Sequence, residues 1–162
     1  MTILVPMPAE RFAEFVDAAA ASHAADNVAS GRWSGQEAQA LARAELERLL
    51  PDGHGTPDHY LYDIKSDPEG APLGFVWFAN VARGGRRVAY LFQLLVFPQY
   101  RRRGHARAAL AALEAAARAH RITTLALNVF GSNDGAQELY RSVGYVITSM
   151  RMQKELPSAN VT

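Results

Sequence analysis

The segment VFPQYRRRGHARAAL, residues 96–110, concentrates groups that can bind an anion. It joins a strand-like run to an alanine-rich helical run through a loop that holds Arg101–Arg103 and Gly104. The start of a helix offers main-chain N–H groups without partners and the positive end of the helix dipole, and a glycine lets a ligand approach the main chain closely. The segment therefore predicts a site for a phosphate or pyrophosphate group.

A tyrosine further along the chain is the second candidate for chemistry. The segment LNVFGSNDGAQELYRSVGY, residues 127–145, is typical of a strand end, a loop, a short helix and a glycine stop. Tyr140 lies 34 residues after Ala106, the length that one helix, one strand and a loop need to return to the anion site. A phenol with a pKa of ~10 keeps its proton at neutral pH and can donate it. Asn133 or Asp134 can cap the short helix, and Asn133 can serve as a cap, as a ligand contact, or as both.

The elements that position these groups follow from turn residues and from the spacing of apolar residues. Four helices are expected: one from about Phe12 to Gly31, one opened by a capping box at Ser34 and Glu37, one from Gly104 to about Ala119, and one from Asn133 to Gly144. Strands are expected at Thr2–Val5, Tyr60–Ile64, Leu73–Val81, Val88–Val96, Ile122–Val129, Tyr145–Thr148 and Met150–Leu156. The turn at Gly84 and Gly85 indicates an antiparallel hairpin, and the strands that flank the alanine-rich helix should be parallel.

Composition limits the class of protein. The 162 residues suit one domain, expected over residues 1–156 with a frayed tail at 157–162. The 17 Lys and Arg and 16 Asp and Glu give a net charge of +1, which argues against a nucleic-acid or membrane partner. Without Cys, a signal-peptide pattern or a long apolar run, a cytoplasmic protein is expected. No spacing of histidines and carboxylates resembles a metal site, so we expect no metal.

Taken together, the two motifs resemble those of the GNAT superfamily of acetyl-coenzyme A (acetyl-CoA) dependent N-acetyltransferases. Arg101, Gly104 and Ala106 match the RxxGxG/A signature of that family, in the same context of a preceding strand and a following helix. The segment 127–145 looks like the second half of the family pattern, with a strand, Asn, Ala, Leu-Tyr and Gly-aromatic in order. The close resemblance covers about residues 73–150.

The resemblance implies a fold, a cosubstrate and a set of site residues. The fold would be α/β (α+β), with about six or seven strands in a mixed sheet, about four helices, and parallel strands that splay apart at the cofactor slot. Acetyl-CoA would be the cosubstrate, bound by Leu95, Val96, Arg101, Arg102, Arg103, Gly104, His105, Ala106 and Asn133. Leu95 and Val96 would bind the pantetheine arm through the main chain, and the amides of the loop would hold the pyrophosphate. Tyr140 would be the general acid in acetyl transfer to a primary amine of a small molecule or peptide.

The group that takes the proton from the amine stays open. Many relatives place an acidic residue on the strand before the loop, where this chain has Gln93, and glutamine cannot act as a base. An α-amine, with a pKa of ~8, can react with water alone as the base. The other candidates, through a bridging water, are Glu47, His54, Asp58 and His59.

Two other functions stay open. The fold could bind acyl-CoA without turnover, as a sensor or binding module. The arginine-rich loop could contact nucleic acid instead, although the near-zero net charge disfavours this. Because many relatives pair through their late strands, the resemblance also suggests a homodimer.

Overall fold

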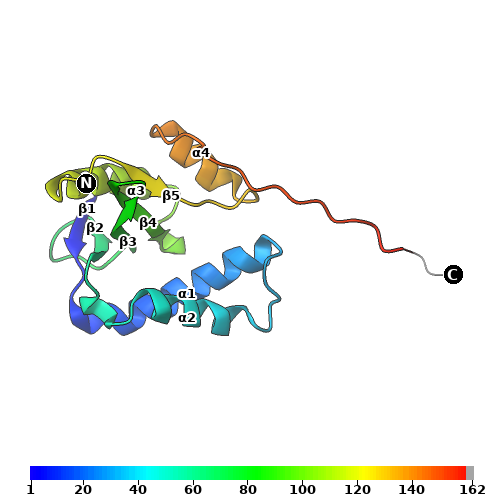
Figure 1. Cartoon of the computed structure of the whole chain (residues 1–162). Coiled ribbons are helices and arrows are strands. Elements are labelled where there is room, and N and C mark those ends of the chain that lie inside the picture. Colours follow the sequence, from blue (N-terminus) through cyan, green and yellow to red (C-terminus); the bar gives the residue numbers. More distant parts are fainter. Residues whose placement is uncertain (160–162) are drawn as a thin grey trace.

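The computed structural model describes residues 1–159 and shows a single mixed sheet with helices on both faces (Figure 1). The strands lie in the order of the sequence: β1 (Ile3–Pro6), β2 (His59–Lys65), β3 (Gly74–Arg83), β4 (Arg86–Val96) and β5 (Leu125–Leu127). The helices are α1 (Phe12–Ala29), α2 (Ala38–Leu49), α3 (His105–Ala119) and α4 (Asp134–Ser142). Strands β1 to β4 pair antiparallel and β5 runs parallel to β4. The predicted α/β class with a mixed sheet is confirmed.

The predicted hairpin between β3 and β4 is confirmed as well. Gly84 and Gly85 form its two-residue turn, with φ angles of 54° and 76°. A two-residue turn that matches the twist of the strands needs positive φ at both central positions, and glycine adopts it at no steric cost.

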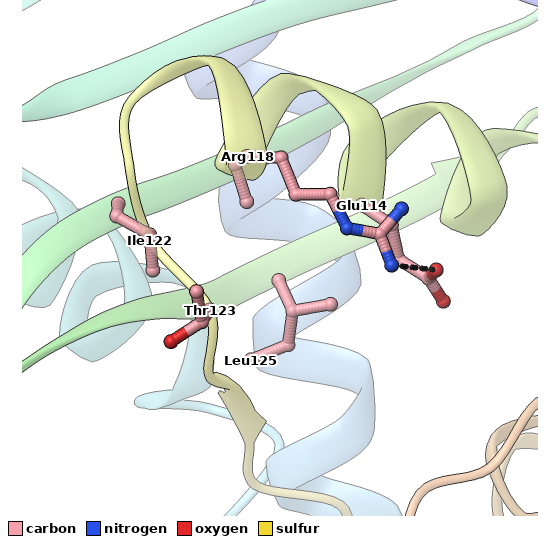
Figure 2. Close-up of a pocket in the computed structure, with 6 residues that line it drawn as sticks. Glu114, Arg118, Ile122, Thr123 and Leu125 are labelled. Carbon is pink, nitrogen blue, oxygen red and sulfur yellow. Dashed lines mark ion pairs between the residues drawn. The ribbon is translucent and has the colours of Figure 1, made fainter.

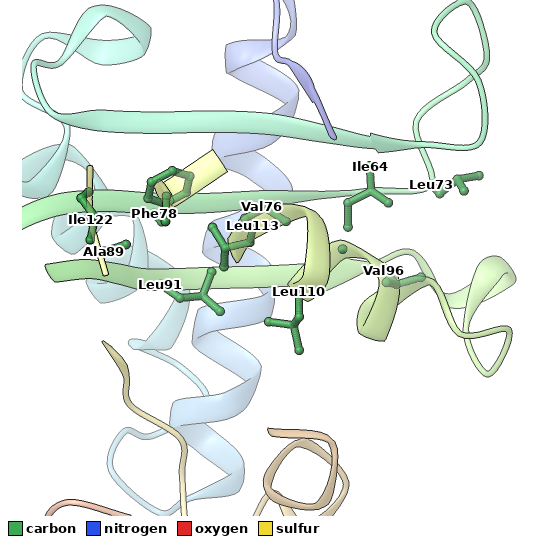
Figure 3. Close-up of a cluster of buried hydrophobic side chains, with 12 residues drawn as sticks. Ile64, Leu73, Val76, Phe78, Ala89, Leu91, Val96, Leu110, Leu113 and Ile122 are labelled. Carbon is green, nitrogen blue, oxygen red and sulfur yellow. The ribbon is translucent and has the colours of Figure 1, made fainter. Parts of the chain in front are cut away.

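Alternation along β3 places a hydrophobic core on each face of the sheet. Val76 and Phe78 point to one face, where they pack with Leu110 and Leu113 of α3 (Figure 3). Phe75 and Trp77 point to the other face and pack with residues of α1 and α2. Successive side chains of a strand lie on opposite faces, so one apolar strand serves both cores. Burying each large apolar side chain contributes about 1.5–3 kcal/mol, which holds α3 and the loop before it against the sheet.

The sheet has five strands in residues 1–159, so the expected count of six or seven was wrong. The segments Tyr145–Thr148 and Met150–Leu156, predicted as strands, run on from α4 as an extended chain that leads away from the sheet (Figure 1). A strand needs a neighbour for its main-chain hydrogen bonds, and this path offers none within the described chain. β5 is also shorter than the predicted Ile122–Val129. Of the predicted frayed tail, residues 160–162 lie outside the described residues.

Helices in the described part of the chain are too short or too polar to cross a membrane.

Candidate functional site

Strands β4 and β5 pair over a short stretch and then separate. Their parallel pairing runs from Ala89 with Leu125 to Leu91 with Leu127, where β5 ends. β4 continues to Val96. Beyond Leu91, the edge of β4 that faces away from β3 has no strand beside it within residues 1–159. The main-chain groups on this edge are therefore open to a ligand, in agreement with the splayed strands that the resemblance implied.

A bulge in β4 lies where the two strands separate. Trp77 of β3 pairs with Gln93 and Phe78 pairs with Leu91, so Phe92 is an extra residue on β4. A bulge bends its strand and reverses the direction of the main-chain groups that follow it. The Phe92 ring stacks on Trp77 with a centroid distance of 4.6 Å, which fixes the bulge against the core on the α1 side.

The direction of the main-chain groups after the bulge corrects one expectation. The Phe97 N–H donates to the Leu73 carbonyl at 2.8 Å, on the β3 side. Since main-chain groups alternate in direction along an antiparallel strand, those of Leu95 also face β3, and those of Leu94 and Val96 face the open edge. Leu95, expected to bind the pantetheine arm through its main chain, is thus engaged within the sheet. Leu94 takes its place beside Val96 among the candidates.

Gly74 is a residue that sequence reasoning missed. It opens β3, and a Cβ atom added there would lie 1.9 Å from the Leu95 carbonyl oxygen. Any side chain at this position would therefore displace the main chain of β4 next to the open edge. A glycine after a proline and a leucine gave no signal of this contact, because the contact depends on a strand register that only the fold defines.

The arginine loop lies between the end of β4 and the start of α3. Arg101 Nε donates to the Val96 carbonyl at 2.8 Å, so this side chain ties the loop to the end of the strand. Arg102 has a positive φ of 60°, and Gly104, at the N-cap of α3, has a φ of 84°. No side chain caps this helix. The N–H groups of its first turn and the exposed Arg103 make this loop electropositive, and an anion at this place stays a prediction.

His105 and Ala106 open helix α3 and can serve the anion site through their N–H groups. The His105 side chain makes a different contact, because its Nδ1 lies 3.0 Å from the Oγ1 of Thr2, the residue just before β1. Ala106 is half-buried and packs against the core below α3. A ligand at the N-terminus of α3 would thus meet the main chain of these two residues.

Asn133 is the N-cap of α4. Its Oδ1 accepts a hydrogen bond from the Ala136 N–H at 3.1 Å. One of the two roles left open by the sequence, that of helix cap, is therefore confirmed. The Asn133 Nδ2 group makes no hydrogen bond within residues 1–159, so it remains available as a donor.

Tyr140 lies half-buried on α4. Its ring meets that of Tyr145 edge to face with 5.5 Å between centroids, and the Tyr145 N–H donates to the Tyr140 carbonyl at 3.0 Å. Burial raises the pKa of the Tyr140 phenol above its usual value of 10.0, and the negative charge of Asp26 raises it further. The phenol therefore keeps its proton throughout the neutral range, as a general acid requires.

Asp26, near the end of α1, is a second residue that the sequence did not reveal. Burial is the main cause of its raised pKa, which the positive groups of His23 and Arg101 partly lower. The negative charge of the same carboxylate also raises the pKa of Tyr140. Nothing in the pattern of α1 distinguishes Asp26 from its other polar residues.

Two of the candidate bases, His54 and His59, already make hydrogen bonds within the protein. His54 Nε2 donates to the Met7 carbonyl at 2.6 Å. His59 Nδ1 accepts the indole N–H of Trp77 at 2.9 Å, and burial lowers its pKa. Since an indole N–H can only donate, His59 must be the neutral tautomer with its proton on Nε2, and it has no free lone pair for another proton.

The two carboxylate candidates, Asp58 and Glu47, are exposed on the surface. Asp58 lies 3.6 Å from Arg87 in an exposed ion pair, and Glu47 is exposed on α2. Gln93 Nε2 donates to the Ala19 carbonyl at 3.3 Å and so links β4 to α1. Within residues 1–159, no three His, Asp or Glu side chains gather as metal ligands would.

Comparisons with known proteins place this arrangement in a family. The model of the Acetyltransferase (GNAT) family matches residues 24–145. YycN of Bacillus subtilis (strain 168), an uncharacterized N-acetyltransferase, is 34% identical over 157 residues, which cover 96% of this chain and 100% of that one. YdgE of the same organism, also an uncharacterized N-acetyltransferase, is 31% identical, with 94% of this chain and 97% of that one covered.

Solved structures show the same similarity. The crystal structure of YycN superposes with a TM-score of 0.91 at 32% identity, covering 97% of this chain and 99% of the other. A predicted acetyltransferase from Clostridium acetobutylicum, solved with acetyl-CoA, superposes with a TM-score of 0.66 at 12% identity, covering 96% of each chain. The second likeness concerns the fold alone.

Proposed function

Since the chain belongs to the GNAT family of acetyltransferases, we propose that it transfers the acetyl group of acetyl-CoA directly to a primary amine of a small molecule or peptide. The observation that carries the proposal is the open edge of β4 next to an uncapped helix start. A long ligand with an anionic group at one end would meet hydrogen-bonding groups along the strand and N–H groups at the helix. Acetyl-CoA is such a ligand, with a long pantetheine arm and a pyrophosphate. The C. acetobutylicum structure was solved with it.

The residues present fit this cosubstrate. Main-chain groups of Leu94 and Val96 face the open edge and suit the amides of the pantetheine arm, although the Val96 carbonyl already accepts from Arg101. The N–H groups of the first turn of α3 suit the pyrophosphate, and the side chains of Arg102 and Arg103 add positive charge. A Cβ atom at Gly104 would meet no protein atom within 4 Å, so the space over the helix start is free for a ligand.

Acetyl-CoA supplies the acetyl group as a thioester, from which the amine nitrogen takes it as the C–N bond forms and the C–S bond breaks. Tyr140 holds the proton that the departing sulfur needs. The amine must arrive without its extra proton, and the attacking nitrogen must lose one more. The two histidines are engaged in hydrogen bonds and Gln93 cannot act as a base, so this proton passes to water, which an α-amine with a pKa of ~8 allows.

A thiol-release assay against a panel of amines tests the proposed reaction. Peptides with free α-amines, peptides with lysines, polyamines and amino sugars would each be mixed with protein and acetyl-CoA, and free coenzyme A would be measured. We expect release with at least one class of amine and none with the corresponding alcohols. Release with alcohols instead would contradict transfer to nitrogen. Tight binding of acetyl-CoA without release from any amine would favour the sensor function.

The dependence of kcat/KM on pH should show a single rise. The raised pKa of Tyr140 keeps the acid protonated to beyond about pH 10, so no alkaline loss is expected below that pH. The rise should follow deprotonation of the amine, near pH ~8 for an α-amine and ~10.4 for a lysine. A fall in kcat/KM between pH 7 and 9 in initial-rate measurements would contradict Tyr140 as the acid.

Substitution of Asn133 separates its role as a cap from its proposed role at the cofactor. Asn133→Asp keeps an oxygen for the Ala136 N–H, so the free energy of unfolding should change by less than about 0.5 kcal/mol, whereas Asn133→Ala should lose about 1 kcal/mol. The aspartate removes the Nδ2 donor and adds a negative charge, so its affinity for acetyl-CoA should fall about tenfold. Equal affinity of the Asp variant and the wild type in calorimetric titration would restrict Asn133 to capping.

A further inference from the structure

Strand β4 presents a row of side chains on the α1 face of the sheet, next to the place where β4 and β5 separate. Arg86 and Tyr90 lie four residues apart and therefore share a face, and Arg83 of β3 is the cross-strand partner of Arg86. The Phe92 ring packs in the core on the α1 side and meets the Tyr90 ring edge to face, with 4.9 Å between ring centres. The row thus leads from the hairpin turn to the bulge where the open edge of β4 begins.

The Arg83 side chain extends back along this row toward the bulge. Its guanidinium carbon lies 4.6 Å from the centre of the Tyr90 ring. A cation at this distance is attracted by the face of the ring, which holds the long side chain against the sheet. The positive charge of Arg83 therefore lies at the level of Tyr90, two residues or about 7 Å along the strand from Phe92.

Arg83 and Arg86 are like charges that face each other without an acidic partner. They are paired directly across the hairpin, and both are exposed. Like charges directly opposite in an antiparallel pair are destabilising. Within residues 1–159, neither arginine forms an ion pair with a carboxylate. An anion bound between the two guanidinium groups would relieve this repulsion.

Two other exposed arginines already have acidic partners. Arg87 follows Arg86 and so points to the opposite face of the sheet, where it lies 3.6 Å from Asp58. Arg118, in the last turn of α3, lies 3.7 Å from Glu114 on the same helix (Figure 2). These two arginines therefore serve as controls, because their loss removes the same positive charge from the α3 side of the molecule.

The α1 face is the side from which an amine would meet the acetyl group. A ligand whose pyrophosphate lies at the start of α3 extends along the open edge of β4 toward Leu91, where β5 fills that edge. On the α3 face, side chains of α3 and α4 pack against the core that includes Leu91. On the α1 face, Tyr90 and Phe92 are only half-buried.

We propose that Arg83 and Arg86 bind a carboxylate of the acceptor, and that the acceptor is an amine with a negative charge about 7–10 Å from its nitrogen. The inference rests on the proposed acetyl transfer and names a class of acceptor for it. A guanidinium forms paired hydrogen bonds with a carboxylate, and two guanidinium groups opposite each other offer such bonds from both sides. In an extended peptide with its α-amine at the bulge, the third side chain would meet this pair, since two residues span about 7 Å.

Binding of three hexapeptides tests this subsite without turnover. Each carries a free α-amine, a C-terminal amide and a fluorophore, and the sequences are Ala-Ala-Glu-Ala-Ala-Ala, Ala-Ala-Gln-Ala-Ala-Ala and Ala-Ala-Ala-Ala-Ala-Glu. With coenzyme A present, fluorescence anisotropy should show that the first peptide binds about tenfold more tightly than the other two. Arg83→Gln with Arg86→Gln should remove this difference, and Arg87→Gln with Arg118→Gln should keep it. Equal affinities of the three peptides for the wild type, no binding of the first peptide below ~1 mM, or the same loss in both double variants would overturn the subsite.

Acetylation of the same peptides separates the subsite from the reaction. In the Arg83/Arg86 variant, KM for the first peptide should rise about tenfold with kcat within about twofold of the wild type, because the two charges lie away from the reacting atoms. The Tm of this variant should not fall, since it loses a pair of repelling charges. Selective binding of the first peptide without acetylation of any peptide would contradict the proposed reaction and support the subsite. Acetylation of all three peptides with equal kcat/KM would support the reaction and overturn the subsite.

Discussion

The Gly104→Val variant is expected to bind acetyl-CoA at least ~100-fold more weakly than the wild type, a loss of about 2.7 kcal/mol. Gly104 starts α3 with a φ of 84°, and the space over it is free of protein atoms. A valine there would place its side chain where the pyrophosphate must approach the N–H groups of the first turn. Its β-branched side chain also resists positive φ, which would shift the helix start itself.

Gly85→Val is the matched control. Gly85 has a φ of 76°, and a Cβ atom there would also meet nothing within 4 Å, but it lies in the β3–β4 turn. Both variants should therefore lose a similar free energy of unfolding, about 1–2 kcal/mol from backbone strain, and the affinity for acetyl-CoA should fall in Gly104→Val alone. Equal affinities in isothermal titration would argue against a ligand at the start of α3.

The Tyr140→Phe variant is expected to lose a factor of ~10² to 10³ in kcat while its affinity for acetyl-CoA changes by less than about threefold. The phenylalanine keeps the ring that packs against Tyr145 and removes only the hydroxyl. The departing sulfur would then leave as an unprotonated thiolate or take its proton from water. Single-turnover rates at saturating acetyl-CoA and amine would measure this loss.

Tyr145→Phe is the control for this loss. The two rings are in contact, and burial raises the pKa of Tyr145 to about 12, so both hydroxyls are protonated at neutral pH. Loss of the Tyr145 hydroxyl should leave kcat within about twofold of the wild type, because nothing assigns it a proton to donate. Equal rates for Tyr140→Phe and the wild type would return Tyr140 to a packing role.

Sequence reasoning succeeded where local chemistry decides the structure. The paired glycines at 84 and 85 specify a tight hairpin turn, and both adopt the positive φ that such a turn requires. Gly104, placed between arginines and an alanine-rich run, marks the start of α3. Asn133 and Asp134 were both candidates for the cap of α4, and Asn133 is the one that caps it. In each case the residue type is selected by a backbone conformation or by a cap that extends over only a few residues.

The predictions from sequence failed where contacts between distant parts of the chain determine the structure. The capping box at Ser34 and Glu37 did not form, since α2 begins at Ala38 and the Ser34 carbonyl accepts the Ala38 N–H instead. Leu95 was expected to bind the pantetheine arm, and its main chain faces β3 instead because the bulge at Phe92, which depends on pairing with β3, changes the direction of the main-chain groups that follow it. Asp26 could not be found, because its charge acts on the pKa of Tyr140 through the fold, from a part of the chain more than 100 residues away.

The last strands were predicted from a pattern that is present in the sequence. Tyr145–Thr148 and Met150–Leu156 have strand-like alternation, yet no strand forms there within the described residues of one chain. A strand requires a neighbouring strand as well as a pattern, and the path of this segment offers none within the described residues.

Calorimetric titration of the wild-type protein with acetyl-CoA tests the central claim most directly, because every proposed role depends on a ligand between the open edge of β4 and the start of α3. The account predicts saturable binding of one acetyl-CoA per chain with a dissociation constant of about 10 µM or tighter, near −7 kcal/mol. It also predicts that binding weakens as salt is added, since part of the affinity is for the pyrophosphate. Absence of saturation at about 1 mM acetyl-CoA would contradict the cofactor site and the acetyl transfer proposed from it.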